Sequence, residues 1–232
     1  MVKRSSIVRA FALAFTIFIL VPPFLGKPLP FYPLMHWADL VDVFTPIVVI
    51  PLYWLLFTDG GRIAHPLRFV VAFVVLAAIW AEGQGMHLSA NSIGNLMGGG
   101  SDDIHRLAHF YDEVLSHYLW HFAILGFAVL LSLSAARASA PDEAVRWVPT
   151  LVWGLLYGLT ASLASLEGET VPMVLPLSAL FVAWLLVRSL DRARSHGVVA
   201  FFLCGYVVAL IVFIGWGIAW GGFPAPSEVG LI

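Results

Sequence analysis

The chain has 232 residues, of which 60% are hydrophobic and only 11% are charged, and its mean hydropathy is +0.92. Soluble domains carry about 25% charged residues, so this composition excludes an ordinary soluble globular protein. The apolar stretches are long and continuous rather than alternating, which favours a helical membrane bundle over a β-barrel. A net charge of −2 argues against nucleic acid as a partner. The single cysteine, Cys204, excludes an internal disulfide and a cysteine-based metal site.

Seven apolar stretches are each near the length of about 20 residues that a helix needs to cross a membrane. We therefore predict an all-α, polytopic bundle of seven transmembrane helices in a single domain, residues 1–232. Basic residues precede the first stretch as in a signal peptide, but Pro22 and Pro23 follow it where a small-residue cleavage site would be, so we predict a retained span. The predicted spans are residues 7–25, 40–57, 67–86, 112–134, 148–166, 171–188 and 198–220.

The positive charges predict the orientation of these spans. If the N-terminus is cytoplasmic, the outer segments contain only Lys27 and Arg106, and the cytoplasmic segments contain the other ten of the twelve basic residues. By the positive-inside rule, this bias predicts a cytoplasmic N-terminus and an external C-terminus. The cytoplasmic set is Lys3, Arg4, Arg9, Arg62, Arg68, Arg137, Arg146, Arg188, Arg192 and Arg194.

Residues 87–111 form the one long connection between spans. The segment is too polar and too rich in glycine to cross the membrane. Connections between helices are usually short, so a longer one suggests a functional segment. We predict that it lies at the membrane interface and covers a site as a lid.

With this orientation, most acids and histidines lie on the outer side, near the ends of four spans. Charged side chains within spans cost several kcal/mol unless they are paired or face water, so such residues are candidates for function. Asp39 and Asp42 share a helix face at the start of the second predicted span, but a functional role is less favoured for them than for the residues below.

A ladder of polar residues spaced four apart runs from His105 through His109, Glu113 and His117 to His121. Residues four apart lie one above the other on a helix and drift by about 40° per step. Glu113, His117 and His121 therefore span about 80° and can point into one site. One oxygen and two nitrogen ligands suit zinc or iron with a position left for water. The alternative is an interhelical hydrogen-bond ladder.

Other acids and histidines could complete this site. His87 and Glu167 are candidates for further metal ligands, against capping or ordinary loop roles. Glu82 and Glu169 are candidates for the general acid or base. Glu82 and His87 diverge by about 140° on an ideal helix and can share a site only if the nearby glycines break it. Those glycines could instead let a neighbouring backbone approach.

Four further residues are candidates for supporting roles. Asp112 could orient a histidine through its second ring nitrogen, or be a solvated acid at a helix start. Asn91 could donate an amide hydrogen to a substrate, or belong to a turn. Arg106 could bind a phosphate or carboxylate, although pairing with Asp102 is favoured. His109 could also contact substrate, although a solvated face is favoured at that position.

Two partial resemblances accompany these motifs. Gly83-x-x-x-His87 followed by Asp112 is similar to the Ser-x-x-x-His and Asp pattern of the alkaline ceramidase and progestin-receptor superfamily, a group of seven-span membrane hydrolases. Glycine stands here in place of serine, and the His-x-x-x-His pair, His117 and His121, lies on the fourth predicted span instead of the last.

The second resemblance is to VanZ-like small membrane proteins. Glu113-x-x-x-His117 resembles their acid-x-x-x-His motif at a helix start, and Glu167 resembles a later acid. Each resemblance covers under a third of the chain. Either implies chemistry on a lipid head group or a lipid-linked molecule at a membrane face.

Together these features predict a metal-assisted hydrolase or transferase that acts on a membrane lipid or lipid-linked substrate at the outer face. The divalent metal, zinc or iron, would lower the pKa of a bound water. Alternatives are a transporter or channel for protons or metal ions, a haem-binding redox subunit, and a structural membrane subunit. In the haem alternative, His87 and one of His109, His117 or His121 would be the axial ligands. A homo-oligomer or membrane-complex subunit is compatible with the sequence, and a prokaryotic inner membrane is the expected location.

Overall fold

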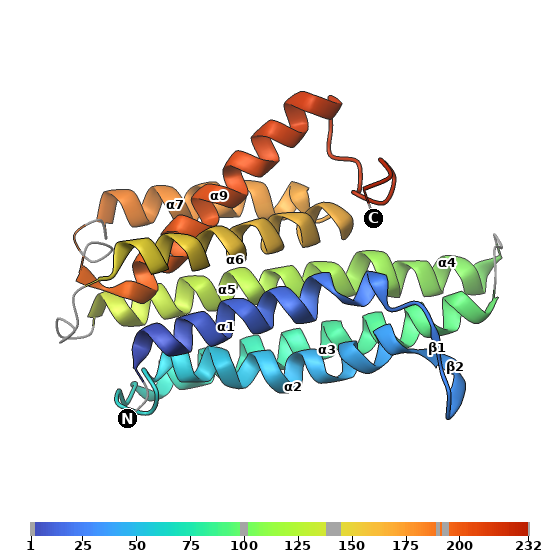
Figure 1. Cartoon of the computed structure of the whole chain (residues 1–232), viewed down its shortest axis with the longest axis horizontal. Helices are drawn as coiled ribbons and strands as arrows, with labels where there is room; N and C mark the ends of the chain where they lie inside the picture. The colour runs from blue at the N-terminus through green and yellow to red at the C-terminus, as the bar shows by residue number, and fades with distance from the viewer. Residues whose placement is uncertain (1–2, 98–101, 138–144, 189–190, 192–194, 232) are drawn as a thin grey trace.

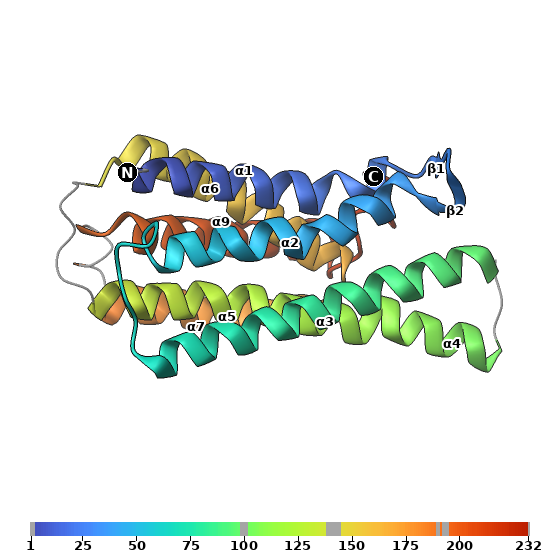
Figure 2. The ribbon, with the colours of Figure 1, turned by 90° about the horizontal axis from the view of Figure 1, so that it is seen from below.

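The computed structural model describes residues 3–97, 102–137, 145–188, 191 and 195–231. Seven long helices form a bundle in which successive helices run in opposite directions, so the N-terminus lies at one end and the C-terminal tail lies toward the other (Figures 1 and 2). The predicted all-α class is confirmed. The long helices are α1 (Arg4–Leu20), α2 (Trp37–Phe57), α3 (Leu67–Met97), α5 (Ser116–Arg137), α6 (Trp147–Glu167), α7 (Val171–Arg188) and α9 (Gly197–Trp220).

Six of these helices are long and apolar enough to cross a membrane, which indicates an integral membrane protein. The α2, α6, α7 and α9 helices begin and end within three residues of their predicted spans. The α1 helix has 17 residues and ends at Leu20 rather than at residue 25. Pro22 and Pro23 lack the N–H group that a continuing helix needs, and the chain turns there through a short 3₁₀ segment, η1 (Pro22–Phe24).

Residues 87–111 differ from the predicted interfacial segment. The α3 helix continues without a break through His87 to Met97, and a second helix, α4 (Asp103–His109), begins soon afterwards. A π-helical turn, η2 (Phe110–Leu115), then joins α4 to α5, so residues 103–137 are one continuous helical run. In Figure 2 the end of α3 and α4 extend past the bundle as a helical hairpin. The described parts of residues 87–111 therefore extend α3 at its end and the α4–α5 helical run at its start.

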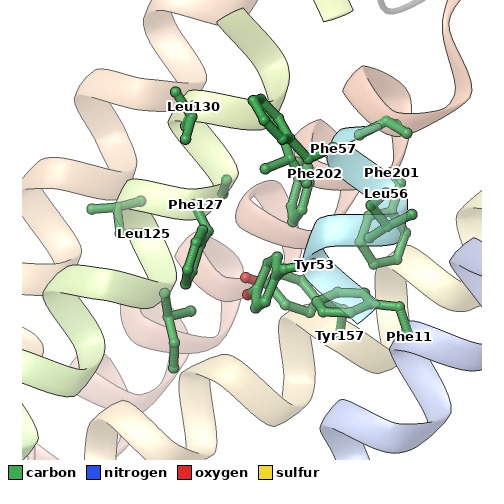
Figure 3. Close-up of a cluster of buried hydrophobic side chains, with 14 of the residues drawn as sticks. Phe11, Tyr53, Leu56, Phe57, Leu125, Phe127, Leu130, Tyr157, Phe201 and Phe202 are labelled. Atoms are coloured by element: carbon green, nitrogen blue, oxygen red, sulfur yellow. The ribbon is translucent and has the colours of Figure 1, made fainter. Parts of the chain in front are cut away.

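Aromatic side chains fill the middle of the bundle (Figure 3). The Tyr53 ring stacks on Phe127 with centroids 4.5 Å apart and meets the edge of Phe11 at 4.4 Å, which joins α1, α2 and α5. Tyr157 of α6 packs against the same cluster, and its hydroxyl lies 3.3 Å from that of Tyr206 on α9. Helices in lipid gain little from the hydrophobic effect, so this close packing and hydrogen bonding hold the bundle together.

Small residues let α6 and α9 approach closely. A Cβ atom on Gly158 would lie 2.2 Å from the Gly205 carbonyl oxygen, and one on Gly154 would lie 2.8 Å from Cys204 Cβ. Two glycines four apart on α6 therefore face α9 in the small-xxx-small arrangement of membrane helix pairs. Cys204 is a packing residue of this contact.

Ion pairs tie the start of α1 to the turn after α2. Arg4 donates to both carboxylate oxygens of Asp59, at 2.8 and 2.6 Å, and Arg62 donates to the same carboxylate at 2.9 Å. Burial alone would raise the pKa of Asp59, but the two guanidinium groups outweigh burial and lower that pKa below its usual 3.8. The ionised carboxylate therefore stabilises the folded state.

We expect Asp59→Asn to lower the free energy of unfolding by about 1–3 kcal/mol at pH 7, because two charge-assisted interactions are lost. Asn tolerates the positive φ of 51° at this position, so backbone strain does not confound the result. A lowered carboxyl pKa stabilises the folded state above about pH 4, and the stabilisation is lost as the pH falls through the folded pKa.

Thermal unfolding in detergent between pH 7 and pH 3 should therefore show the wild-type advantage shrinking below about pH 4. Asp103→Asn is the matched control, because the exposed Asp103–Arg106 pair contributes at most about 1 kcal/mol. A wild-type advantage that stays constant down to pH 3 would contradict the assignment.

Candidate functional site

A cavity of about 260 Å³ lies where α1, α3 and α6 finish and where α2 and α5 begin. We call this end of the bundle the site end. Polar and apolar side chains share its walls, with Phe18 and Pro22 of the α1 end on the apolar side. The polar residues that line it are Asp42, Gln84, His87, Asn91, Glu113, His117 and Glu167, and Trp120 lies among them.

His87 and Asp112 form a close ion pair between α3 and the π-helical turn. His87 Nδ1 of α3 lies 2.7 Å from Asp112 Oδ1 of the π-helical turn. His87 lines the cavity, whereas Asp112 is buried behind it and does not. The structure thus places Asp112 beside one ring nitrogen of a histidine, and His87 Nε2 is the nitrogen that the carboxylate does not contact.

The π-helical turn sets the directions of the two neighbouring acids. Its extra residue per turn breaks the four-residue spacing that the sequence predicts for an ideal helix. Asp112 therefore points to α3 while Glu113 lines the cavity. The Ser116 hydroxyl donates to the Asp112 carbonyl oxygen at the end of the turn. Such π turns occur often at functional sites.

Two glycines allow the helices around the cavity to approach. A Cβ atom on Gly83 of α3 would lie 2.9 Å from the Ser116 carbonyl oxygen and 3.2 Å from the Trp120 backbone nitrogen. Gly168, in the turn after α6, lies against the His117 ring, and a Cβ there would lie 2.9 Å from Nδ1. Of the two glycines near Glu82, Gly83 therefore serves close approach, and neither Gly83 nor Gly85 breaks α3.

Asp42 and Gln84 belong to the site, although the sequence interpretation did not select them. The Gln84 amide donates to Asp42 Oδ1 at 3.3 Å and links α2 to α3. Both side chains are buried and line the cavity. The sequence signal that could have identified both residues is the presence of a carboxylate and an amide inside otherwise apolar helices. Asp39 instead caps α2, because its carboxylate accepts a hydrogen bond from the His36 backbone at 2.7 Å.

The predicted metal ligands do not meet at one point. Glu113 Oε2 lies 3.5 Å from His117 Nδ1, but the His117 and His121 rings are 6.4 Å apart. His121 Nδ1 lies 2.9 Å from the His117 carbonyl oxygen, and its ring is buried within α5. The described residues contain no group of three or more His, Cys, Asp or Glu side chains placed to hold a metal ion.

Several predicted site residues lie outside the cavity. Glu82 is exposed on α3, because the intact helix turns it away from His87. Glu169 is exposed in the turn after α6, at a positive φ of 51°. His109 is exposed on α4, and Arg106 is exposed there and pairs with Asp103 rather than with Asp102. Asn91, predicted to bind substrate, and Glu167, predicted as a metal ligand, both line the cavity.

No protein-family model, curated protein or solved structure matches this chain. The chemistry of the site must therefore be argued from its own residues. The rings of His87 and His117 lie only 4.9 Å apart and are tilted by 38°, which leaves no room for a haem plane between them. The geometry instead favours proton transfer, because a histidine–carboxylate pair faces a cavity that contains a second histidine and further acids.

We expect Gly83→Ala to lower the free energy of unfolding by about 1–3 kcal/mol, because the added methyl group meets backbone atoms of α5 that cannot move aside. The measurement is the thermal unfolding midpoint in detergent. Gly85→Ala is the matched control on the same helix, because no atom lies within 4 Å of its added Cβ and alanine favours the helix. Equal midpoints for the two variants would show that α3 and α5 do not approach at Gly83.

Proposed function

We propose that this protein is a membrane-embedded hydrolase or transferase that acts on a lipid or lipid-linked substrate at one membrane face. The observation that carries the proposal is the His87–Asp112 pair, whose histidine lines a cavity beside His117 and together with Glu113 near the ends of the spanning helices. A buried pair of this kind lies at a site where a proton can be moved, and it contributes little to packing.

The depth of the cavity supports a substrate that resides in the membrane. Leu67 to His87, His117 to Arg137 and Trp147 to Glu167 each cover about 20 residues, or about 30 Å of helix. This length equals the hydrocarbon thickness of a bilayer. Three helices would therefore place the cavity at the boundary between hydrocarbon and head groups, where the linkages of a lipid lie.

The basic residues support the orientation of the site. Among the described residues, eight of the ten lysines and arginines fall on segments at the end opposite the site, and Arg192 and Arg194 lie outside the described residues. The positive-inside rule then makes that end cytoplasmic and makes the site face the other side of the membrane. Seven crossings follow if α1 also spans. We propose a prokaryotic inner membrane as the location.

Each residue of the site has a separate role in the proposed reaction. The Asp112 carboxylate, 2.7 Å from His87 Nδ1, would keep the proton on that nitrogen, so Nε2 can take a proton from a water molecule. The resulting oxygen nucleophile attacks an ester, amide or phosphoester centre held in the cavity. Glu113 or His117 donates a proton to the leaving group on the opposite side. For a transferase, a substrate hydroxyl replaces the water.

A divalent metal, zinc or iron, stays a prediction. Glu113 and His117 supply donor types that such a metal accepts, but their present geometry offers no third ligand at one point, so no step above passes through a metal. The likeness of Gly83-x-x-x-His87 and Asp112 to the ceramidase superfamily motif, and of Glu113-x-x-x-His117 to the VanZ-like motif, adds support for lipid chemistry.

We expect His87→Ala and Asp112→Asn each to lower turnover by about 10²–10⁴-fold, because the first removes the base and the second its orientation. The assay incubates the reconstituted protein with a membrane lipid extract and follows released products by mass spectrometry. Asp103→Asn, an exposed acid on α4, is the control that keeps wild-type turnover. Folded His87→Ala and Asp112→Asn proteins that retain full turnover would refute the proposed base.

Elemental analysis of the same samples tests the metal. About one zinc or iron per chain, lost in Glu113→Gln and His117→Ala, would support a metal-assisted reaction. Full turnover in metal-free protein would remove the metal from the proposal and leave the His87–Asp112 base in place.

A further inference from the structure

The walls of the cavity carry acids on several sides and no fixed cation. Asp42 comes from α2, Glu113 from the π-helical turn and Glu167 from the end of α6. No lysine or arginine is among the described residues that line the cavity. The two basic residues assigned to this end of the bundle are both exposed, Lys27 before the β1–β2 hairpin (Pro28–Leu29 and Tyr32–His36) and Arg106 on α4.

Two of these acids have neutral partners, and the third, Glu113, lies 3.5 Å from His117 Nδ1. Asp42 accepts a hydrogen bond from the Gln84 amide, and Glu167 accepts one from the Ser227 backbone at 3.0 Å. His87 supplies at most one positive charge, and Asp112 lies against it. Carboxylates in a membrane protein are costly unless a positive charge or water compensates them. The cavity therefore favours a ligand that carries a positive charge.

Two buried side chains among the lining residues carry hydrogen-bonding atoms that have no partner. Gln84 is 4% exposed, and its Oε1 has no hydrogen-bond partner because its amide nitrogen serves Asp42. His117 is 6% exposed, and its Nδ1 likewise has no partner within hydrogen-bond geometry. Carboxylates and the Gln84 carbonyl are acceptors, so the complementary group is a donor as well as a cation. Trp120 adds an aromatic wall that can favour a cation.

The positions of the acids fit an organic cation better than a metal ion. A zinc or calcium ion requires its ligands within about 2.0–2.6 Å of one centre. The acids here lie on three separate elements, and no described group of three His, Asp or Glu side chains is placed around one point. An alkylammonium group is larger and reaches its acceptors through three N–H groups at hydrogen-bond distances of about 2.7–3.2 Å.

We propose that the cavity binds the protonated primary amine of an amine-bearing lipid or lipid-linked substrate, with Asp42 and Glu113 as its charge partners and Gln84 as a further acceptor. This inference rests on the proposed function and names the substrate class of the same site. The apolar wall formed by Phe18 and Pro22 would contact the adjoining hydrocarbon. Phosphate and carboxylate groups are disfavoured there by the same acids.

The test compares three probes of equal chain length, octylammonium, octanol and octanoate, against the purified full-length protein in nonionic detergent at about 150 mM salt. Binding is measured by microscale thermophoresis and by the shift of the unfolding midpoint. We expect octylammonium to bind at least about tenfold more tightly than either other probe, because charge-assisted hydrogen bonds contribute about 1.5–3 kcal/mol each. Equal binding of octylammonium and octanoate would overturn the inference.

Two substitutions locate the binding site. Asp42→Asn and Glu113→Gln should each weaken octylammonium binding by about tenfold and leave octanol binding unchanged. Glu113 is 44% exposed, so Glu113→Gln should fold even if the buried Asp42→Asn protein does not. Asp103→Asn removes one charge outside the cavity and should leave octylammonium binding unchanged. Unchanged binding in folded Glu113→Gln, or about one metal ion per chain held by Glu113, would overturn the inference.

The outcomes separate this inference from the proposed function. Octylammonium binding without turnover of any amine-bearing lipid would support the amine site and refute the enzyme. Turnover of neutral or anionic lipids that octylammonium does not inhibit would support the enzyme and refute the amine site. Turnover of amine-bearing lipids with competitive inhibition by octylammonium would support both.

Discussion

The backbone contact between α3 and α5 at Gly83 determines where the chemistry of this protein lies. Without a side chain at this position, α3 approaches the Ser116 carbonyl and the Trp120 amide directly. His87 lies one turn further along α3, and Asp112 lies one turn before Ser116, so the same approach brings both side chains to 2.7 Å. The π-helical turn then directs Asp112 toward α3 and leaves Glu113 facing the cavity. The absence of a side chain at Gly83 and the π-helical turn before α5 together bring the residues of two helices into one site.

The distribution of ionisable groups favours a site over a path across the membrane. Apart from Glu82 and His121, which lie within about one turn of the lining residues, the long helices contain no Asp, Glu or His between the cavity and the opposite end in the part of the chain that the structure describes. Polar groups do occur in the core, but they are hydroxyls that mostly satisfy one another or the backbone, such as Thr16 with Thr160 at 2.9 Å and Tyr157 with Tyr206 at 3.3 Å. Hydroxyls of this kind bind helices together, whereas a proton or metal-ion transporter is expected to carry ionisable groups further inward.

Sequence patterns predicted the fold well because hydropathy and length decide which segments can span a membrane. They failed in residues 87–111, where polarity was interpreted as the end of a helix, although helices can extend beyond the hydrocarbon into water. The site was predicted in part. Four predicted residues do come together: His87, Asp112, Glu113 and His117. The prediction of one continuous four-residue ladder was wrong, because a π-helical turn interrupts the α-helical spacing and no sequence feature of the segment indicates that turn. Gln84 was missed and Asp42 was considered but less favoured, because their pairing joins positions 42 residues apart, which local periodicity does not report.

The cavity has an amphipathic lining that agrees with its depth. Phe18 and Pro22 bring apolar surface from the end of α1, while Asp42, Glu113 and Glu167 bring acids from three other elements. Acids at the ends of spanning helices can keep partial access to water and so avoid most of the cost of burial in hydrocarbon. A lipid has the same arrangement as the cavity walls, because its apolar chains lie on one side of the linkage and its polar head group lies on the other. The apolar wall that contacts the chains therefore favours an amphiphile, and the acidic walls favour an amphiphile whose head group carries a positive charge.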